Sequence, residues 1–499
     1  MKALIGIDIG TSCTKSVLFD TNGSVIAAAS YEYPMHQPQN GFAEADPADW
    51  WRAVCITLRQ VTETGRGSEI VGIGLSGQMH SLVMLDEKDR VLRPAILWCD
   101  QRTADECAEI EALVGKERLI DIMANPALTG FTASKLMWVK KHEPEIFRKC
   151  KHVLLAKDYI RLMLTGEYAT DVSDASGMQL LDVKKRCWSR EVCDLLGIPM
   201  HWLASVRESC EISGYIHARA AAETGLSAGI PVAAGGGDNA CAAIGTGVCR
   251  DGEAFTTIGT SGVVFAHTKS PIIDPKGRIH TFCAAVPQEW HVMGVTQAAG
   301  LSLSWLRNHF IGNDSYAEID RQCEQIPIGS EALLYLPYLM GERTPILDPD
   351  VRGVFFGLSA VHTKYHAARA VMEGVSFSLR NALDVLRELE IAPDNMRICG
   401  GGSKSVFWKA MLADVYRMPV ITMHSDEGAA LGAAILGGCA AGVYTSVSEG
   451  CKRATAQKVC VVPNAERAAA YEKSYALYNQ LYPCLKECFQ ELKKMRGGI

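Results

Sequence analysis

The feature that most limits the possible folds is a short pattern that occurs twice, about half the chain apart. Residues 6–12 read GIDIGTS, and residues 255–262 read FTTIGTSG. In both places an apolar run leads into a Gly-Thr-Ser loop and a second apolar run follows, which is typical of two strands joined by a tight turn. Such a recurrence predicts a duplicated domain pair. The 499 residues are also too many for one ordinary hydrophobic core.

The Gly-Thr-Ser loops are expected to join strands rather than to open a helix. After the first loop, residues 15–19 form a second apolar run, residues 20–23 supply a hairpin turn, and residues 25–29 return as a third strand. This arrangement excludes the phosphate-binding loops that lie at helix N-termini. Residues 72–77, GIGLSG, have the spacing of a dinucleotide fingerprint, but a strand is predicted at residues 81–85 where that fold needs a helix, so a nicotinamide site is disfavoured.

A third glycine-rich stretch lies between the two loops, where residues 231–245 read PVAAGGGDNACAAIG. A buried strand is expected at residues 231–234, followed by three glycines, Asp238 and Asn239, and then a helix of small residues. Successive glycines let the backbone approach a ligand closely, and Asp238 would be presented at the end of a strand, which suits a general base. A Gly-rich turn with an Asp helix cap explains this stretch alone equally well.

Charge and composition restrict the partners of the chain. With 50 basic and 56 acidic residues the formal net charge is −6, and no Lys/Arg block occurs, so nucleic acid is not an expected partner. The first residues reach an acidic side chain at Asp8, too soon for a signal peptide, and none of the 18 cysteines is spaced as Cys-x-x-Cys. These features favour a cytoplasmic protein with reduced thiols. Residues 428–448 are uncharged but rich in Gly and Ala, which favours a packed interior helix over a membrane span.

The two Gly-Thr-Ser loops carry groups that can bind phosphate. They are Asp8, Gly10, Thr11 and Ser12 in the first loop, and Gly259, Thr260, Ser261 and Gly262 in the second. Amides and hydroxyls at such turns can point at phosphate oxygens, and the carboxylate of Asp8 could hold a hydrated magnesium ion. A third glycine loop at residues 400–402 permits close approach of a base or ribose. Together these loops predict a site for a nucleoside triphosphate, although no Gly-x-x-x-x-Gly-Lys-Ser/Thr motif is present.

Three pairs of polar residues at predicted strand ends of the first half could bind a small polyhydroxylated molecule. They are Met79 and His80, Asp100 and Arg102, and Asp238 and Asn239. Asp238 would accept the proton of a sugar hydroxyl as its oxygen attacks the γ-phosphate of ATP. The polar segment at residues 170–177 is interpreted as a turn cluster that serves only as a loop. An actin-like or chaperone-like ATPase that changes shape without modifying a sugar is the alternative from another class of protein.

Taken together, the motifs resemble those of the FGGY carbohydrate kinases of the actin-like ATPase superfamily. The segments that carry the resemblance, in order along the chain, are GIDIGTS, SGQMH, WCDQR, GGGDN, TIGTSG, GERTP, CGGGSKS and EGAALGAA. The resemblance implies an α/β protein with two ribonuclease-H-like domains, at residues 1–248 and 249–499, and a catalytic cleft between them that holds ATP and Mg²⁺ and closes on the sugar. It also implies ATP-dependent phosphorylation of a ketopentose, most closely D-xylulose, with another ketose, a polyol or a sugar acid as alternatives.

The resemblance also implies roles for individual positions. The general base corresponds to Asp238, the sugar contacts to Met79, His80 and Asn239, the first phosphate loop to Asp8, Thr11 and Ser12, the second to Gly259 and Thr260, and the nucleotide contacts to Gly300, Gly401 and Ser405. Relatives that act on glycerol carry Gln and Asn where Ser304 and Ser405 stand here, which leaves the details of nucleotide contact open. The oligomeric state also stays open, with a homodimer as one expectation.

Overall fold

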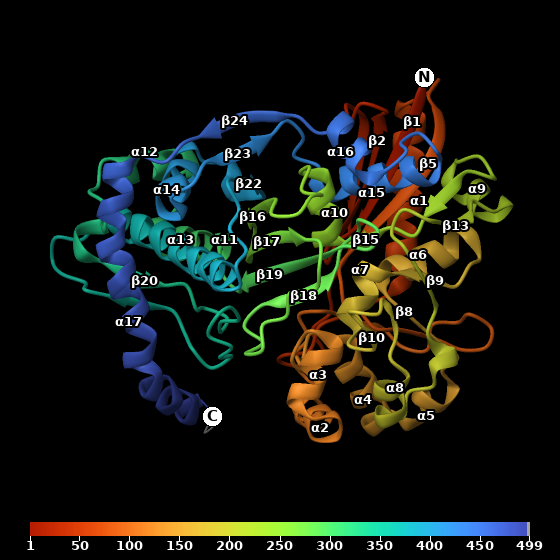
Figure 1. Cartoon of the computed structure of the whole chain (residues 1–499), viewed down its shortest axis with the longest axis horizontal. Coiled ribbons are helices and arrows are strands. Elements are labelled where there is room, and N and C mark those ends of the chain that lie inside the picture. The colour runs from red at the N-terminus through yellow and green to blue at the C-terminus, as the bar shows by residue number, and fades with distance from the viewer. Residues whose placement is uncertain (497–499) are drawn as a thin grey trace.

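The computed structural model describes residues 1–496, which are organised around two large mixed sheets (Figure 1). The first sheet has the order β13-β14-β5-β1-β2-β3, with β15 paired to β5, and the second has the order β18-β19-β17-β16-β22-β23-β24. The strands of the first sheet are β1 (Lys2–Ile9), β2 (Cys13–Asp20), β3 (Val25–Glu32), β5 (Glu69–Gly77), β13 (Ile212–Tyr215), β14 (Pro231–Ala233) and β15 (Gly236–Gly237). The strands of the second are β16 (Ala254–Ile258), β17 (Gly262–Thr268), β18 (His280–Cys283), β19 (Trp290–Thr296), β22 (Met396–Cys399), β23 (Val420–Met423) and β24 (Gln457–Val461). The predicted α/β class with two sheets is confirmed.

Both sheets have the same local arrangement around their Gly-Thr-Ser loops. β1 pairs antiparallel with β2 and parallel with β5, and β16 likewise pairs antiparallel with β17 and parallel with β22. The two predicted hairpins are therefore confirmed. The segment that follows β5 leads into the strand β6 rather than a helix, so a dinucleotide fold is ruled out. The remaining short strands are β4 (Glu44–Ala45), β6 (Val83–Leu85), β7 (Ala95–Ile96), β8 (His152–Leu154), β9 (Ala169–Asp171), β10 (Leu181–Asp182), β11 (Cys187–Trp188), β12 (Ser205–Arg207), β20 (Leu334–Leu336) and β21 (Val354–Phe356).

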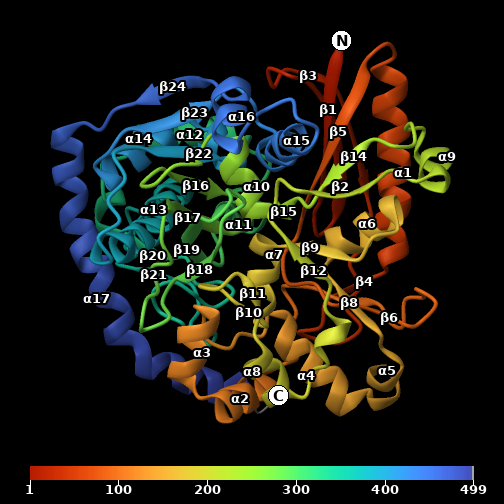
Figure 2. The same cartoon turned by 45° about the vertical axis from the view of Figure 1, so that its right-hand side comes forward.

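Helices cover both sheets, and several helices of the first half form a separate region below the first sheet in the view of Figure 1. The helices of the first half are α1 (Pro47–Thr64), α2 (Ala104–Val114), α3 (Lys116–Met123), α4 (Thr132–His142), α5 (Pro144–Lys149), α6 (Ala156–Thr165), α7 (Val172–Ala175), α8 (Arg190–Leu196), α9 (Ala218–Thr224) and α10 (Asp238–Gly245). Those of the second half are α11 (Gly300–Leu306), α12 (Tyr316–Glu324), α13 (Lys364–Glu388), α14 (Val406–Tyr416), α15 (Gly428–Ala440), α16 (Val447–Ala454) and α17 (Ala465–Arg496). Figures 1 and 2 both show α17 along the outer side of the second half, far from the first sheet.

The two faces of the first sheet are covered by helices from different halves of the chain. Successive residues of β1 point to opposite faces, so one set packs around α1 and the other around α15. α15 comes very close to the sheet because Gly6 has no side chain: a Cβ there would lie 1.8 Å from the carbonyl oxygen of Ala430. The first part of the uncharged stretch, Gly428–Ala440, is therefore a packed interior helix, as predicted, and residues 441–446 form the loop after it. None of the helices in residues 1–496 combines the length and the apolar character that a bilayer span needs.

The packing of α15 and α16 bears on the predicted domain boundary between residues 248 and 249. Both helices come after that boundary, yet both pack in one core with the strand β1 and with α10. The hydroxyl of Tyr444, just after α15, also donates a 2.9 Å hydrogen bond to the carbonyl oxygen of Thr21. The two halves are thus joined by a shared core, and the boundary itself stays a prediction.

Candidate functional site

Asp238 lies where strand β15 gives way to helix α10, so its position is fixed by the first turn of a helix. Its Oδ1 accepts hydrogen bonds from the backbone N (2.7 Å) and from the Nδ2 (3.0 Å) of Asn239. Burial and, second, the negative charge of Asp8 raise the pKa of Asp238 to about 7. A carboxyl group with a pKa near neutrality suits proton transfer at physiological pH. Gly237 occupies the N-cap position, so capping the helix is not the task of Asp238.

Met79 and His80 lie beside the loop that presents Asp238. Met79 packs on Gly237, where an added Cβ would lie only 2.8 Å from the Cγ of Met79. The Nδ1 of His80 lies 2.7 Å from the carbonyl oxygen of Gly177. Because a carbonyl oxygen only accepts, Nδ1 must carry the proton, and Nε2 presents a lone pair. Burial lowers the pKa of His80 well below its usual value, so the neutral ring can accept a hydrogen bond from a hydroxyl.

The segment at residues 170–177, expected to be only a polar loop, is instead a buried support of this site. It forms the end of β9, the short α7 and the start of a 3-10 turn, and every residue in it is buried. The Oγ of Ser173 accepts a hydrogen bond from the backbone N of Gly237 (3.1 Å), while the carbonyl of Gly177 holds the ring of His80. One short segment therefore positions both the loop of the candidate base and the candidate sugar-binding histidine.

A buried ionic network, which the sequence analysis missed, lies behind that segment. The Nζ of Lys157 contacts Asp158 (2.7 Å), Asp171 (2.9 Å) and Asp174 (3.1 Å), and all four side chains are almost completely shielded from solvent. The hydroxyl of Ser173 donates to Asp171 at 2.5 Å, so the network reaches the glycine loop before Asp238 through a single hydroxyl. Removing one member of such a network leaves an unpaired buried charge, which is strongly destabilising. No spacing in the sequence marks this group of residues.

The first Gly-Thr-Ser loop is held in place by side chains. The carbonyl oxygen of Gly10 accepts hydrogen bonds from the hydroxyl of Tyr33 (2.6 Å) and the Nε2 of Gln78 (3.1 Å). The Nε1 of Trp98 donates to the Oγ1 of Thr11 at 2.9 Å. The Oε1 of Gln78 is buried and has no protein partner within residues 1–496. A buried acceptor without a protein partner is unusual and marks this position beside the loop as a candidate contact for a donor group.

Asp8 stands at the base of this loop, two residues before Gly10. Its Oδ1 accepts a 2.7 Å hydrogen bond from the hydroxyl of Ser76. Burial raises the pKa of Asp8, although the hydrogen bond from Ser76 and the positive charge of Lys15 oppose the shift. Ser12 is exposed at the tip of the turn. A nearby cation would stabilise the ionised form of this buried carboxyl group.

The surroundings of Asp8 were tested for a magnesium site. Across residues 1–496 there is no group of three His, Cys, Asp or Glu side chains that could enclose a metal ion. Mg²⁺ in phosphoryl-transfer enzymes does not need one, because it keeps several waters and binds one or two carboxylates together with phosphate oxygens. Asp8 lies close enough to Asp238 for its charge to raise the pKa of that residue. Asp8 therefore fits a hydrated Mg²⁺, and its role as a metal ligand stays a prediction.

The second Gly-Thr-Ser loop is held in place by backbone atoms. The backbone N of Ala299 donates to the carbonyl oxygen of Thr260 (3.0 Å), and that of Gly300 donates to the carbonyl oxygen of Gly259 (2.8 Å). A Cβ at Gly300 would lie 2.5 Å from the oxygen of Gly259. Gly400 has a φ of 85°, and a Cβ there would lie 2.8 Å from a carbonyl oxygen at the end of β16. Side chains at these positions would push the loop away.

Gly401 and Ser405 follow in the triple-glycine loop. A Cβ at Gly401 would lie 3.9 Å from the end of β16, so this glycine borders the same turn. Ser405 is the N-cap of α14, where its Oγ accepts a 2.9 Å hydrogen bond from the backbone N of Trp408. The structure thus brings together Gly259, Thr260, Gly300 and Gly401 and gives Ser405 a capping role, while their contacts with nucleotide stay predictions.

An ion pair joins the first hairpin to the second half of the chain. The Nζ of Lys15 in β2 lies 2.5 Å from the carboxylate of Glu427, which precedes α15. Next to it, Asp426 contributes, after burial, to the raised pKa of Cys399, which is about 12. Cys399 directly precedes the triple-glycine loop. The first hairpin and the candidate nucleotide loop therefore border the same region between the two halves.

Asp100 and Arg102 bind each other rather than facing Asp238. The Nε and Nη2 of Arg102 donate to the two carboxylate oxygens of Asp100 at 2.9 and 2.7 Å. Asp100 also accepts from the backbone N of Ala43 (2.6 Å), and the guanidinium of Arg102 lies over the ring of Phe42. Both side chains are almost fully shielded from solvent. These contacts hold the loop at residues 42–43, and the predicted sugar contact of this pair remains untested.

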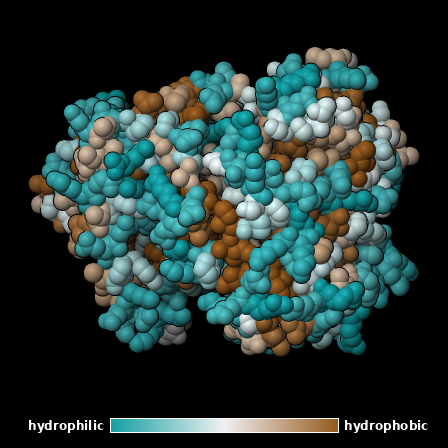
Figure 3. All heavy atoms as spheres, in the orientation of Figure 1, coloured by the Kyte–Doolittle hydropathy of each residue, from teal (hydrophilic) through white to brown (hydrophobic). Residues whose placement is uncertain are grey.

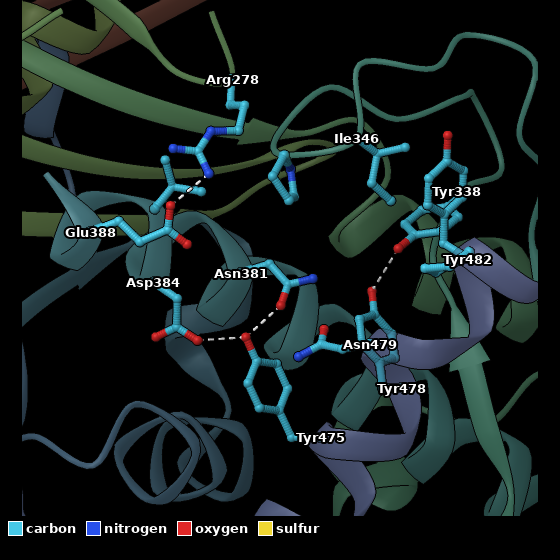
Figure 4. A pocket seen from close by; sticks show the side chains of 13 residues that line it. Arg278, Tyr338, Ile346, Asn381, Asp384, Glu388, Tyr475, Tyr478, Asn479 and Tyr482 are labelled. Atoms are coloured by element: carbon cyan, nitrogen blue, oxygen red, sulfur yellow. Dashed lines mark hydrogen bonds and ion pairs between the residues drawn. The ribbon is translucent and has the colours of Figure 1, made fainter. Parts of the chain in front are cut away.

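A hollow opens between the two halves at the lower edge of the molecule, with apolar side chains exposed above it (Figure 3). A separate cavity of about 330 Å³ lies in the second half between α13, α17 and the loop that contains Ile346 (Figure 4). Its polar groups are already paired: the hydroxyl of Tyr475 donates to Asp384 at 2.6 Å, and Arg278 contacts Glu388 at 2.6 Å. None of the predicted site residues lines this cavity.

Comparisons with known proteins agree with this geometry. Residues 3–245 match the N-terminal domain of the FGGY family of carbohydrate kinases, and residues 254–441 match its C-terminal domain. A xylulose kinase from Bacillus subtilis (strain 168) is 39% identical over 99% of this chain and 100% of its own length. The structure of ligand-bound xylulose kinase from Lactobacillus acidophilus has a TM-score of 0.94 at 29% identity, covering 99% of this chain and 100% of that one. A gluconate kinase structure from the same species has a TM-score of 0.93 at 29% identity, covering 98% and 99%.

Proposed function

Because the chain belongs to the FGGY family of carbohydrate kinases, we propose that it phosphorylates D-xylulose at the terminal hydroxyl, with ATP as the phosphoryl donor. The products would be D-xylulose 5-phosphate and ADP. The observation that carries the proposal is the environment of Asp238, a carboxyl group with a pKa of about 7 beside the loop of His80 and the charge of Asp8. Identity with xylulose kinases over nearly the whole chain supports D-xylulose as the sugar.

In the proposed reaction Asp238 takes the proton of the terminal hydroxyl as that oxygen attacks the γ-phosphorus. The new O–P bond forms while the bond between the γ-phosphorus and the β,γ-bridging oxygen breaks and ADP leaves. Asn239 holds the Oδ1 of Asp238, so Oδ2 is available for the proton. The Nε2 of His80 accepts a hydrogen bond from another sugar hydroxyl, and Met79 forms an apolar wall.

The phosphate groups would be bound by the two hairpins. The amides and hydroxyls of residues 10–12 and 259–261 lie at turns that can bind phosphate oxygens. Gly300 lets the second turn pack closely on α11, and Gly401, where the nearest atom to an added Cβ would be 3.9 Å away, would let the nucleoside approach. A Mg²⁺ ion bound by Asp8 would offset the negative charge of the transferred group.

The sugar can be identified by an ADP-release assay over pentuloses, hexuloses, polyols and aldonic acids. D-xylulose is expected to give the highest kcat/KM. Gluconate is the second candidate. The gluconate kinase structure and the ligand-bound xylulose kinase structure are both 29% identical to this chain, and their TM-scores are 0.93 and 0.94. Rapid phosphorylation of a different sugar, with none of D-xylulose, would reject the proposed substrate and keep the kinase. ATP turnover that no sugar changes would favour an ATPase that acts as a conformational switch.

A further inference from the structure

Arg343 lies in the loop between β20 and β21. Its two neighbours in the chain, Glu342 and Thr344, are hydrogen-bonded to β19 and to Gln297, the residue that follows β19. The carboxylate of Glu342 accepts hydrogen bonds from the Oγ1 of Thr296 (2.6 Å) and the backbone N of Gln297 (3.0 Å). The backbone N of Thr344 donates a 3.0 Å hydrogen bond to the carbonyl oxygen of Val295 in β19. The backbone N of Val295 in turn donates a 3.0 Å hydrogen bond to the Oγ1 of Thr344. The backbone at Arg343 is therefore fixed, and so is the direction from which its side chain enters the space between the halves.

The guanidinium of Arg343 reaches across to the first half. A Cβ at Gly130 would lie 3.3 Å from its Nη2, so the guanidinium packs against that glycine. The Nζ of Lys135 binds the carbonyl oxygen of Gly130 (2.7 Å) and that of His80 (2.8 Å), which ties Gly130 to the candidate sugar loop. Burial and, less strongly, the positive charge of Arg343 lower the pKa of His280 to about 3, so Arg343 also faces a second buried histidine.

No acceptor of the protein satisfies this guanidinium. Among residues 1–496 there is no hydrogen bond or ion pair to its Nε, Nη1 or Nη2, although the side chain is half-buried and burial lowers its pKa. The backbone N of Arg343 does donate a hydrogen bond, to the carboxylate of Glu342 (2.8 Å). A guanidinium carries five N–H donors, and placing them in a partly buried space without acceptors is costly. Acceptors are therefore expected from a ligand.

The position of Arg343 favours a ligand in the sugar site. Gly130, which packs against Arg343, also lies close to Trp98: a Cβ at Gly130 would be 2.8 Å from the carbonyl oxygen of Trp98. The indole N–H of Trp98 binds Thr11 in the first phosphate loop. Arg343 thus lies on the His80 side of that loop, where the oxygens of a sugar would lie. Sugar hydroxyl and carbonyl oxygens are suitable acceptors for the planar donor pair of a guanidinium.

We propose that Arg343 is a sugar-contact residue supplied by the second half, donating hydrogen bonds to sugar oxygens other than the hydroxyl that attacks the phosphate. This inference rests on the proposed function, because it places a sugar beside His80 and Asp238. The contact joins the two halves through the substrate: the sugar lies on loops of the first half and is bound by a side chain that β19 holds in the second.

The test compares Arg343→Gln and Arg343→Lys with the wild-type enzyme. Arg343→Gln is expected to raise the KM of the sugar by about 10- to 100-fold, the loss typical of a hydrogen bond to a charged group. The Kd of the sugar, measured by calorimetry without nucleotide, should rise by the same factor. Arg343→Lys keeps the charge and should recover part of the affinity. The KM of ATP is expected to change by less than about 2-fold in both variants, since their nucleotide contacts are intact. The matched control is Arg321→Gln, an exposed arginine on α12 paired with Glu318, which should behave as wild type.

Two outcomes would overturn the inference. Unchanged sugar Kd and KM with a large fall in kcat would assign Arg343 to the transferred phosphoryl group, and unchanged kinetics throughout would assign it no ligand. Both variants are checked for a wild-type thermal midpoint, and the charge-preserving Arg343→Lys still decides the question if Arg343→Gln folds poorly. The sugar used is the one that the wild-type enzyme phosphorylates best. A preference for another sugar therefore rejects the proposed substrate without affecting the test of Arg343.

Discussion

The two Gly-Thr-Ser hairpins share one backbone arrangement but differ in what holds them and in the charge beside them. In the first, three side chains bind the loop, and Asp8 stands two residues before its glycine. In the second, backbone amides and close glycines hold the loop, and Thr257 occupies the position of Asp8. The duplicated motif therefore supplies two turns able to bind anions, and only the first has a carboxylate next to it.

This difference indicates a division of roles between the halves. Asp8, Asp238 and His80 all belong to the first half, so the candidate acid–base and metal chemistry lies on one side of the cleft. The second half contributes Gly300 and Gly400, whose missing side chains let their backbones pack closely against the end of β16 and the turn that follows it. A hairpin that binds a metal next to a general base needs a carboxylate in a fixed position. A hairpin that packs against a nucleotide instead needs backbone without bulky side chains.

The largest effect is expected from Asp238→Asn, which removes the base and keeps the shape. We expect kcat to fall by about 10³- to 10⁴-fold, the upper part of the range for general bases, with ATP affinity within about 2-fold. Steady-state kinetics and nucleotide titration measure both. Glu427→Gln is the control carboxylate, which precedes α15, the partner helix of α10. It should cost far less because the side chain of Glu427 pairs with Lys15 and its charge acts on the candidate site only indirectly, through Asp8. Similar losses in the two variants would show that the assignment of the base is wrong.

A smaller effect is expected from the matched positions of the two hairpins. Asp8→Asn should lower kcat/KM by about 10²-fold and raise the Mg²⁺ concentration needed for half-maximal rate, because it removes the carboxylate that we propose as the metal ligand. Thr257→Val should leave the Mg²⁺ dependence unchanged. Equal responses to Mg²⁺ in the two variants would remove the proposed difference between the hairpins.

The pH dependence sharpens the same comparison. Because burial and the charge of Asp8 raise the pKa of Asp238 to about 7, the carboxylate form is lost as the pH falls below that value. The kcat/KM should therefore fall about tenfold per pH unit below pH 7 and level off above it. In Asp8→Asn the midpoint should move to lower pH, since a negative charge that disfavours ionisation has been removed. A wild-type midpoint near 4 would contradict the assigned environment.

The parts of the fold that could be predicted are those that local pattern determines. The turn at residues 10–12 is flanked by apolar strands. The three glycines before Asp238 allow the backbone of that loop to approach a ligand closely. The uncharged Gly and Ala of α15 likewise indicate a helix that packs backbone to backbone. In each case the residues that form the feature lie within a few positions of one another, so a single window of sequence contains the whole physical reason.

The contacts that could not be predicted join segments far apart in the chain. Ser173 binds the backbone of Gly237, and its own segment looked like a polar turn because its hydroxyls and carboxylates have buried partners that the local sequence does not show. Arg343 reaches Gly130 only because β19 orients its loop. Asp100 and Arg102 are a related case: their position at the end of a predicted strand suggested a sugar contact, which stays a prediction, and the sequence did not show that they also pair with each other. Tertiary packing determines such partners, and composition does not.

The smallest effect is expected from a single methyl group beside the backbone-held hairpin. In Gly300→Ala the new Cβ would lie 2.5 Å from the carbonyl oxygen of Gly259, closer than the 3.0 Å below which real Cβ contacts essentially never occur, so the backbone of the turn must move. We expect the KM of ATP to rise about 5-fold with kcat nearly unchanged, because a weakened ground-state contact with nucleotide affects binding first. Asn308→Ala, at an exposed position just beyond α11, is the control and should leave the KM unchanged. If Gly300→Ala instead lowers kcat and leaves the KM of ATP intact, the second hairpin takes part in the chemical step, and the proposed division of roles between the two hairpins fails.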